Sequence, residues 1–367
     1  MIESAPDIII VGSGPAGVST WLHLHRLDPA LAERTLVLEK ARHPRPKLCA
    51  GGVMRTADAV LARLRIRIDT PAVPIHAVEF RYHGRRFYWR RRNYFRVVRR
   101  HEFDAALVAV ARQRGMRLHE METFRRLQRD GDGLWVETNQ RSYRTRALVA
   151  ADGANSAVRL GLGLRETTRL ARLIEILTPT DASRAPEFGQ NMAVFDLSGW
   201  DQGLQGYVWD FPCWENGHAA ISRGIYDSRV YTRRPRADLK QLFRSALEAR
   251  GALHPDQPWQ GHPERWFDPR ATFAQPHVLL VGDAAGVDPF AGEGISFALQ
   301  YGEVAARELV AAFETGDFTF SRYRQHVLAH PMGKDLRLRR RLARLTYRGW
   351  PALVFSIVSG VLSHLWR

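Results

Sequence analysis

The hydrophobic and polar positions along the chain predict an α/β protein that begins with a buried strand. Residues 8–11 form an apolar run, residues 12–17 form a glycine-rich turn, and helical spacing of apolar residues follows. A second apolar run, residues 35–38, ends at Glu39. Uninterrupted apolar runs are typical of parallel strands that are buried on both faces. This part of the chain therefore predicts a strand, a turn, a helix and a strand in succession.

The glycine turn has the spacing of a dinucleotide-binding loop. Gly12, Gly14 and Gly17 lack the Cβ atoms that would keep the backbone away from a pyrophosphate, and the turn opens a helix whose N–H groups face the phosphates. Glu39 lies 22 residues after Gly17, where an acidic side chain can hold the ribose hydroxyls of an adenosine. NAD and FAD both fit this pattern, and a purely structural turn is the alternative.

Two later segments repeat the strand-to-turn pattern, and an aspartate follows each strand. Asp152 follows the apolar residues 147–150, and Asp283 follows the apolar residues 278–281 after a single glycine. Helical spacing of apolar residues begins again at Ile295. Taken alone, Asp152 and the glycine after it are equally compatible with a hairpin turn. Three such turns in this order indicate a cofactor-binding α/β fold.

In this order the motifs resemble those of the FAD-dependent oxidoreductases of the glutathione-reductase type. The resemblance covers about residues 5 to 325 and is to the group that holds aromatic-ring hydroxylases, flavin halogenases and geranylgeranyl reductases. It implies that Asp283 binds the ribitol chain of FAD and that the helix beginning at Ile295 directs its positive end at the flavin. The residues implied to bind FAD are Gly12, Gly14, Pro15, Ala16, Gly17, Glu39, Lys40, Lys47, Arg100, Asp152, Gly282, Asp283, Pro289, Gly292, Gly294 and Ile295.

Within this group the chain is most similar to the geranylgeranyl reductases. Residues 45–52, RPKLCAGG, resemble the segment that joins the first flavin-binding unit of these enzymes to the rest, and residues 289–294 resemble their loop beside the flavin. Gly286 stands where many hydroxylases carry a histidine. Residues 207–212 resemble a strand of the reductases' substrate domain, although Leu204 replaces a proline that the family pattern expects.

The resemblance implies a reductase that saturates carbon–carbon double bonds of an isoprenoid or other polyene lipid. Reduced flavin would deliver hydride to one carbon while a proton is added to its neighbour. Cys49 is the candidate for proton delivery or flavin positioning, and a buried inert thiol is the alternative. Tyr207, Trp209 and Phe211 alternate along a strand and so share one face, where they form aromatic walls of the substrate site or ordinary core.

A monooxygenase that hydroxylates an aromatic substrate is the rival activity, because it shares the FAD motifs. Flavin halogenases are less favoured, since they carry a second tryptophan at the position of Tyr207 and isoleucine at that of Phe211.

The charge balance adds an indication about partners. The 367 residues include 54 Lys and Arg against 38 Asp and Glu, a formal net charge of +16. Nine arginines lie within residues 81–100 and alternate with aromatic residues, a pattern that suits strands with one solvated face. An anionic lipid surface, a diphosphate-bearing substrate or an acidic electron carrier are the functional alternatives. No nucleic-acid-binding signature accompanies these arginines, so no nucleic acid partner is expected.

The order of the motifs predicts an FAD-binding domain of Rossmann type that is discontinuous in sequence, over residues 1–75, 97–165 and 270–330. Residues 76–96 and 166–269 are expected to form an α+β substrate domain built on an antiparallel sheet.

Residues 331–367 are expected to be a basic and hydrophobic C-terminal helical tail. Arginines between residues 337 and 348 precede the uncharged residues 349–366. These 18 residues are at the lower limit for a membrane span, and a helix packed on the protein or an interfacial anchor are the alternatives.

The sequence predicts a cytoplasmic enzyme with a hydrophobic or prenylated small-molecule substrate and a peripheral membrane contact through the tail. Two cysteines, Cys49 and Cys213, cannot form a disulfide framework, no cluster has metal-ligand spacing, and no signal peptide is expected before the first strand. No second dinucleotide fingerprint lies between the second and third motifs. Electrons are therefore expected from transiently docked NAD(P)H or from a reduced ferredoxin-type carrier.

Overall fold

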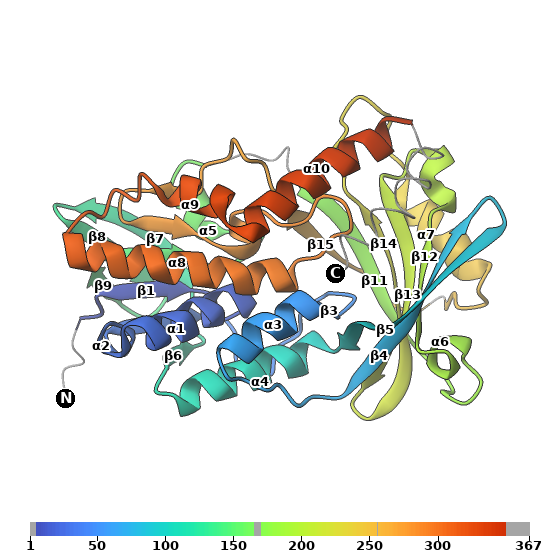
Figure 1. Ribbon diagram of the computed structural model, residues 1–367, viewed down its shortest axis with the longest axis horizontal. Helices are drawn as coiled ribbons and strands as arrows, with labels where there is room; N and C mark the ends of the chain where they lie inside the picture. Colours follow the sequence, from blue (N-terminus) through green and yellow to red (C-terminus); the bar gives the residue numbers. More distant parts are fainter. Residues whose placement is uncertain (1–4, 165–169, 255, 350–367) are drawn as a thin grey trace.

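A computed structural model describes residues 5–164, 170–254 and 256–349. The molecule is elongated, with two units side by side along its long axis (Figure 1). One unit is built on a six-stranded sheet and the other on an eight-stranded sheet. We refer to them as the six-stranded unit and the eight-stranded unit.

The six-stranded unit contains the apolar runs that predicted buried strands. Its strand order is β16-β17-β10-β1-β2-β6, and every pairing is parallel except that between β16 and β17. In register, Val11 lies opposite Leu38 and Ala150, so the turns after β1 and β10 and the end of β2 meet at one edge of the sheet. The strands are β1 (Ile8–Val11), β2 (Thr35–Glu39), β6 (Arg117–Glu120), β10 (Ala147–Ala150), β16 (Ala274–Gln275) and β17 (Val278–Leu280).

Helices and a small sheet complete this unit. The helices α1 and α8 lie against each other, and a Cβ on Gly302 would lie 2.5 Å from Ser19 Oγ, so their backbones approach closely. Ser19 Oγ also donates a 2.7 Å hydrogen bond to the carbonyl of Leu299. The elements are α1 (Pro15–Leu27), α2 (Pro29–Glu33), α3 (Arg55–Arg63), α4 (Arg100–Gln113), α5 (Ala157–Gly161), η2 (Gly282–Ala284), α8 (Ile295–Thr315), α9 (Tyr323–Ala329) and the three-stranded sheet β7 (Phe124–Asp130), β8 (Gly133–Thr138) and β9 (Ser142–Thr145).

The eight-stranded unit holds the residues expected to bind substrate. Its strand order is β15-β11-β14-β13-β12-β4-β5-β3, and only β4 and β12 pair in parallel. The helix α7 packs on one face of this sheet, and buried aromatic residues cover the other. The elements are β3 (Gly52–Met54), β4 (Ala72–Tyr82), β5 (Arg85–Val98), β11 (Leu170–Pro179), α6 (Pro186–Gly189), β12 (Met192–Asp196), η1 (Ser198–Gln202), β13 (Gly206–Glu215), β14 (His218–Asp227), α7 (Leu239–Glu248) and β15 (Gln260–Arg265).

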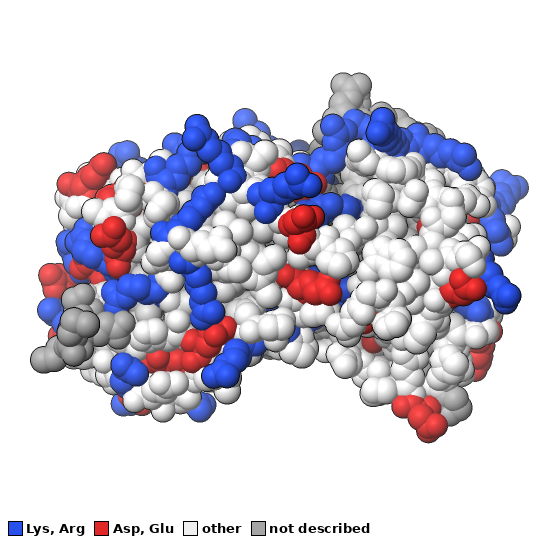
Figure 2. Space-filling model, turned by 90° about the horizontal axis from the view of Figure 1, so that it is seen from below, with Lys and Arg blue, Asp and Glu red and all other residues white. Residues whose placement is uncertain are grey.

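The arginine-rich segment forms the long β4–β5 hairpin, and its predicted alternation is confirmed. Arg86, Tyr88, Arg90 and Arg92 are exposed, whereas the Trp89 ring meets Phe80 edge to face with centroids 5.0 Å apart. Seen from below, basic side chains gather along the rim of the eight-stranded unit and leave much of its central surface uncharged (Figure 2).

The C-terminal helix α10 (Pro331–Gly349) runs from the six-stranded unit across to the eight-stranded unit (Figure 1). The helix covers the basic part of the tail expected over residues 331–367, and all of the uncharged residues 349–366 except Gly349 lie outside the described residues. Among the residues that the structure describes, no helix has both the length and the apolar character needed to cross a bilayer.

Candidate active site

Two positions in the first glycine turn have no room for a side chain. Gly12 has a φ of +104°, and a Cβ there would lie 2.4 Å from the carbonyl oxygen of Ala151. A Cβ on Gly17 would lie 1.9 Å from the carbonyl oxygen of Gly12. Both glycines therefore allow the start of α1 to approach the turns at the edge of the sheet.

Gly14, in contrast, faces open space. A Cβ added there would meet only the Arg45 guanidinium within 4 Å, at 3.6 Å. Pro15 is the first residue of α1, and Ala16 packs against the second glycine turn, since a Cβ on Gly282 would lie 2.8 Å from that of Ala16. The N–H groups at the start of α1 and the nearby guanidinium suit the diphosphate of a dinucleotide.

Glu39 is held at the end of β2 as an ionised carboxylate. It accepts hydrogen bonds from the N–H (3.1 Å) and Oγ (2.8 Å) of Ser13 and from the N–H of Ala41 (3.2 Å). Burial opposes ionisation, but the Arg45 guanidinium and these hydrogen bonds together lower the pKa of Glu39. Lys40, the next residue, has an exposed side chain.

Asp152 follows β10 and retains an unused acceptor. Its Oδ2 accepts a 3.1 Å hydrogen bond from the N–H of Val158, whereas its Oδ1 is buried without a partner among the described residues. Burial raises the pKa of Asp152. A free buried acceptor beside a side-chain-free turn fits a bound dinucleotide with hydroxyl donors, as FAD has. The residues present therefore fit this cofactor.

The second glycine turn brings Asp283 to the start of α8. A Cβ on Gly294 would lie 3.6 Å from Asp283 Oδ1, and α8 begins at the next residue, Ile295. Gly292 has a φ of +64°, and a Cβ there would lie 3.0 Å from the Tyr226 ring. The loop before α8 thus packs tightly against the eight-stranded unit.

This loop, residues 288–291, is held by its carbonyl groups. Four successive carbonyl oxygens each accept a hydrogen bond from one hydroxyl group of another element. The pairs are Tyr226 Oη with Asp288 (3.3 Å), Ser228 Oγ with Pro289 (2.5 Å), Tyr347 Oη with Phe290 (3.0 Å) and Tyr207 Oη with Ala291 (2.5 Å). Three of the donors come from β13, from β14 and from the residue after β14, and the fourth comes from α10.

The side chain of Asp288 fixes the same loop from within. Its carboxylate accepts hydrogen bonds from the N–H groups of Phe290 (2.8 Å) and Ala291 (3.2 Å). The Nη1 atom of Arg339, on α10, lies 2.7 Å from Asp288 Oδ2, and both side chains are buried. The C-terminal helix therefore supports the loop through an ion pair and a tyrosine hydroxyl.

Cys49 lies in the segment that joins the two units. It is half-buried, its N–H donates a 2.8 Å hydrogen bond to Glu175 Oε2, and its Sγ accepts one of 3.4 Å from the N–H of Gly51. The buried Arg100 guanidinium, which makes two bonds of 2.8 and 2.9 Å to the carboxylate of Asp104, is also close enough to the Cys49 thiol to interact with it electrostatically. Cys213, by comparison, is fully buried, and burial raises the pKa of its thiol to about 11.

Lys47 and His262 form a close pair at this junction. Lys47 Nζ lies 2.7 Å from His262 Nε2. Burial lowers the pKa of Lys47, and burial together with Lys47 lowers the pKa of His262 to about 4. A neutral imidazole therefore accepts a hydrogen bond from the ammonium group, and Asp283 is close enough to favour that positive charge.

Two buried glutamates lie close to the loop before α8, Glu264 on β15 and Glu293 between the loop and α8. Burial, with Asp283 and Asp288 nearby, raises the pKa of Glu264 well above its ordinary value, and Glu264 Oε1 has no partner among the described residues. Burial raises the pKa of Glu293 to about 7, although Arg339 opposes this. The site can therefore hold protons on carboxyl groups at neutral pH.

Tyr207, Trp209 and Phe211 lie on one face of β13, within the buried aromatic cluster of the eight-stranded unit. Tyr207 reaches the loop before α8, whereas Trp209 Nε1 donates to Ser222 Oγ (3.2 Å) and Phe211 packs between Phe95 and Phe195. The structure thus brings Tyr207 to the residues expected to bind flavin and places Trp209 and Phe211 deeper in the core.

Several residues of this site were not singled out from the sequence. Glu175, Glu264 and His262 lie on strands of the eight-stranded sheet, and Arg339 and Tyr347 lie on α10. Glu175 had a signal, because it is a lone charge within the apolar run from Leu173 to Leu177. Arg339 belongs to the arginines noted between residues 337 and 348, but its partner Asp288 is 51 positions away, and Glu264, His262 and Tyr347 had no signal.

Residues 5–317 match the FAD binding domain family. The chain belongs to this family. The FAD-binding chain is 29% identical over 341 residues to digeranylgeranylglycerophospholipid reductase 1 of Methanopyrus kandleri, covering 86% of this chain and 83% of that protein. It is 26% identical over 357 residues to menaquinone reductase of Mycolicibacterium smegmatis, covering 87% of this chain and 79% of that protein.

Solved structures share the fold of this FAD-binding protein. A geranylgeranyl bacteriochlorophyll reductase-like protein of Thermoplasma acidophilum superimposes with a TM-score of 0.75 at 19% identity, covering 93% of this chain and 86% of that chain. A probable FAD-dependent monooxygenase of Pseudomonas aeruginosa, PqsL, superimposes with a TM-score of 0.68 at 17% identity, covering 94% and 96%. At these identities the likeness shows the fold alone, which reductases and monooxygenases share.

Proposed function

We propose that this FAD-dependent oxidoreductase reduces carbon–carbon double bonds of a prenylated or other polyene lipid. The observation that carries the proposal is the position of Cys49. Its thiol lies beside Arg100, and Glu175 ties its backbone to the aromatic side of the eight-stranded sheet. A thiol held between an FAD-binding unit and an apolar aromatic surface suits proton delivery to a hydrocarbon. The name of one similar protein, digeranylgeranylglycerophospholipid reductase 1, supports a prenyl-bearing substrate.

Bound FAD in its reduced form would supply the hydride that makes one new carbon–hydrogen bond. The Sγ–H of Cys49 gives its proton to the neighbouring carbon as the π bond breaks, and the sulfur then takes a proton from water. Tyr207 and the aromatic residues behind it exclude water from the alkene. An isolated alkene is a poor hydride acceptor, so orientation and a dry site contribute most to the rate.

The outer face of α10 supports contact with an anionic lipid surface. Arg341, Arg344 and Arg348 are exposed there, together with Leu338 and Leu345, which are 42% and 56% exposed. Cationic and apolar side chains on one helix face are typical of interfacial helices. The same helix supports the loop before α8, so a membrane-bound substrate would lie near the site. NAD(P)H, docked transiently, or an acidic ferredoxin-type carrier supplies the electrons in this proposal.

The deciding experiment follows product mass. The flavin-reduced protein is mixed with geranylgeranyl lipids, prenylated quinones, other polyenes and phenols, with and without oxygen. Gain of two hydrogens per double bond without oxygen is the expected result. Cys49→Ser is expected to retain FAD and lose turnover, whereas Cys213→Ala, at a buried thiol, retains both. Unchanged turnover of Cys49→Ser with every substrate would remove this thiol from the mechanism.

A flavin-dependent monooxygenase is the second candidate, because the fold of PqsL is shared over nearly the whole chain. It predicts a product that gains one oxygen atom, only in air, with faster NAD(P)H oxidation when an aromatic substrate is present. That outcome would replace the reductase proposal.

A further inference from the structure

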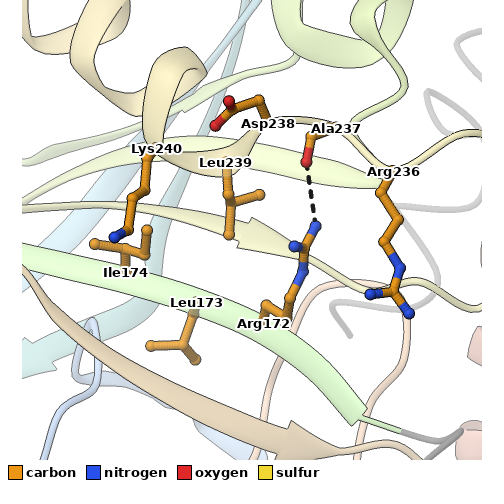
Figure 3. Close-up of a pocket in the computed structure, with 8 residues that line it drawn as sticks. All are labelled: Arg172, Leu173, Ile174, Arg236, Ala237, Asp238, Leu239 and Lys240. Atoms are coloured by element: carbon orange, nitrogen blue, oxygen red, sulfur yellow. Dashed lines mark hydrogen bonds between the residues drawn. The ribbon is translucent and has the colours of Figure 1, made fainter.

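A pocket on the eight-stranded unit lies apart from the residues described above. It has a volume of about 470 Å³ and lies between the first part of β11 and the segment that leads into α7 (Figure 3). Pockets of this size hold small ligands. The lining residues are Arg172, Leu173, Ile174, Arg236, Ala237, Asp238, Leu239 and Lys240.

Basic side chains flank the pocket, and two of them have no counter-ion in the part of the chain that the structure describes. Arg172 is fixed by bonds to the carboxylate of Asp227 and, at 3.3 Å, to the carbonyl of Ala237, yet its Nε is buried without an acceptor among the described residues. Arg236 and Lys240 are exposed and make no ion pair with any described residue. Figure 3 shows Arg236 beside Arg172, with Lys240 on the opposite side.

The charges around the pocket are unbalanced. Burial lowers the pKa of Arg229, and the positive charges of Arg172 and Arg236 lower it further, whereas Asp227 alone opposes them. Among the lining residues, three cationic side chains face one carboxylate, that of Asp238, which keeps its negative charge while it accepts the N–H of Gln241 at the start of α7. Guanidinium groups that repel one another around an open space are stabilised by a bound anion.

The space between the basic groups is apolar. Leu173, Ile174 and Leu239 lie between Arg172 on one side and Lys240 on the other (Figure 3). At ~30 Å³ for each water molecule, a pocket of about 470 Å³ corresponds to about sixteen water molecules. The ligand that fits has an anionic head and a hydrocarbon part.

We propose that this pocket binds the phosphate or diphosphate head of a hydrocarbon-bearing ligand, with Arg172, Arg236 and Lys240 as its cationic partners. Arginine forms two parallel hydrogen bonds with phosphate oxygens, and lysine adds a point charge. The pocket and the loop before α8 are at the same end of the sheet, because Asp227 adjoins the pocket and Ser228 bonds the carbonyl of Pro289. That this ligand is the lipid substrate rests on the proposed function.

The test is equilibrium binding to the full-length oxidised protein, without reductant. The probes are inorganic diphosphate, geranylgeranyl diphosphate and the uncharged alcohol geranylgeraniol, followed by calorimetry. Arg236→Ala/Lys240→Ala is expected to raise the Kd for geranylgeranyl diphosphate by tenfold or more, since hydrogen bonds to charged groups contribute about 1.5–3 kcal/mol and 1.4 kcal/mol is tenfold. Arg184→Ala, which removes an exposed arginine elsewhere, leaves this Kd unchanged.

The probes also separate the two sources of a phosphate group. A lipid head group is supported if geranylgeranyl diphosphate binds more tightly than inorganic diphosphate. The Kd for geranylgeraniol should then be unchanged by the double substitution. Equal binding of both diphosphates would overturn the hydrocarbon part, and a Kd that the double substitution changes by less than twofold would overturn the site. Because binding is measured without turnover, a failed reductase assay would leave the binding result valid. Reductase activity without this binding would overturn the proposed pocket and leave the proposed function standing.

Discussion

The backbone N–H of Cys49 donates a 2.8 Å hydrogen bond to Oε2 of Glu175, a residue 126 positions later in the middle of β11. The other carboxylate oxygen of Glu175 accepts from Ser222 Oγ at 3.0 Å and lies 3.3 Å from Arg99 Nη1. Ser222 in turn accepts the N–H of the Trp209 ring. One buried carboxylate thus joins the segment between the two units, an arginine and the aromatic strand.

Replacement of Glu175 separates its role as an acceptor from its charge. Glu175→Leu removes the acceptor for Cys49 and leaves Arg99 without one of its buried partners, so we expect a loss of about 3–5 kcal/mol in the free energy of unfolding. Glu175→Gln keeps an oxygen for the N–H of Cys49, so this variant is expected to retain most of the turnover of the unsubstituted protein. Alkylation of Cys49 by iodoacetamide provides a readout that is independent of turnover.

A matched control is Glu215→Gln. Glu215 also pairs with Arg99, at 2.5 Å, but has no contact with Cys49. If Glu175→Gln and Glu215→Gln changed the alkylation rate of Cys49 equally, the Glu175 contact would not position the thiol.

Glu293 predicts a dependence of stability on pH. Its pKa is raised from 4.5 to about 7 in the folded protein, so the folded state binds more protons than the unfolded state between these values. Its contribution is fully present below about pH 4.5 and is lost as pH rises to about 7, with an upper limit of about 3 kcal/mol. Glu293→Gln is expected to remove this part of the slope in urea unfolding between pH 5 and 8. A slope identical to that of the unsubstituted protein would contradict the assignment.

Loss of Arg339 is expected to loosen the loop before α8. Arg339→Ala leaves Asp288 buried and unpaired, which costs about 3–5 kcal/mol when one partner of a buried pair is removed. We expect weaker FAD retention, measured by flavin released on gel filtration. Tyr347→Phe removes one hydroxyl bond and is expected to cost about 1 kcal/mol. Arg341→Ala, on the exposed face of the same helix, is the control and retains FAD.

The α10 arginines show how far sequence reasoning extends. The glycine turns, the apolar strands and the aspartates are local patterns, and the structure contains them where they were predicted. The arginines of residues 337–348 were considered only together, as part of a tail that either packs on the protein or contacts a membrane, whereas Arg339 is buried against Asp288 and Arg341 is exposed. This division depends on which face of α10 meets the loop before α8. Glu175 was missed although it is a lone charge in an apolar run, because its partner Cys49 lies 126 positions earlier, in the segment that joins the two units.

Gly17 tests the dinucleotide turn directly. Gly17→Ala places a Cβ 1.9 Å from the carbonyl oxygen of Gly12, so the turn must shift, which costs about 1–3 kcal/mol for overpacking. FAD affinity is expected to fall at least tenfold in fluorescence titration. Gly189→Ala adds a methyl group where no atom lies within 4 Å and leaves FAD binding unchanged. Normal FAD affinity of Gly17→Ala would show that the diphosphate does not depend on this approach.

The exposed face of α10 predicts binding to anionic vesicles. Near an anionic membrane each arginine contributes about 1 kcal/mol, so Arg341→Ala/Arg344→Ala/Arg348→Ala should weaken binding to phosphatidylserine-containing vesicles about 100-fold. The effect should diminish as salt rises, because the attraction is screened. Arg34→Ala/Arg126→Ala/Arg184→Ala, which removes three arginines paired with surface acids, is the charge-matched control. Equal weakening in both triple variants would mean that net charge, and not this helix face, carries the attraction to lipid.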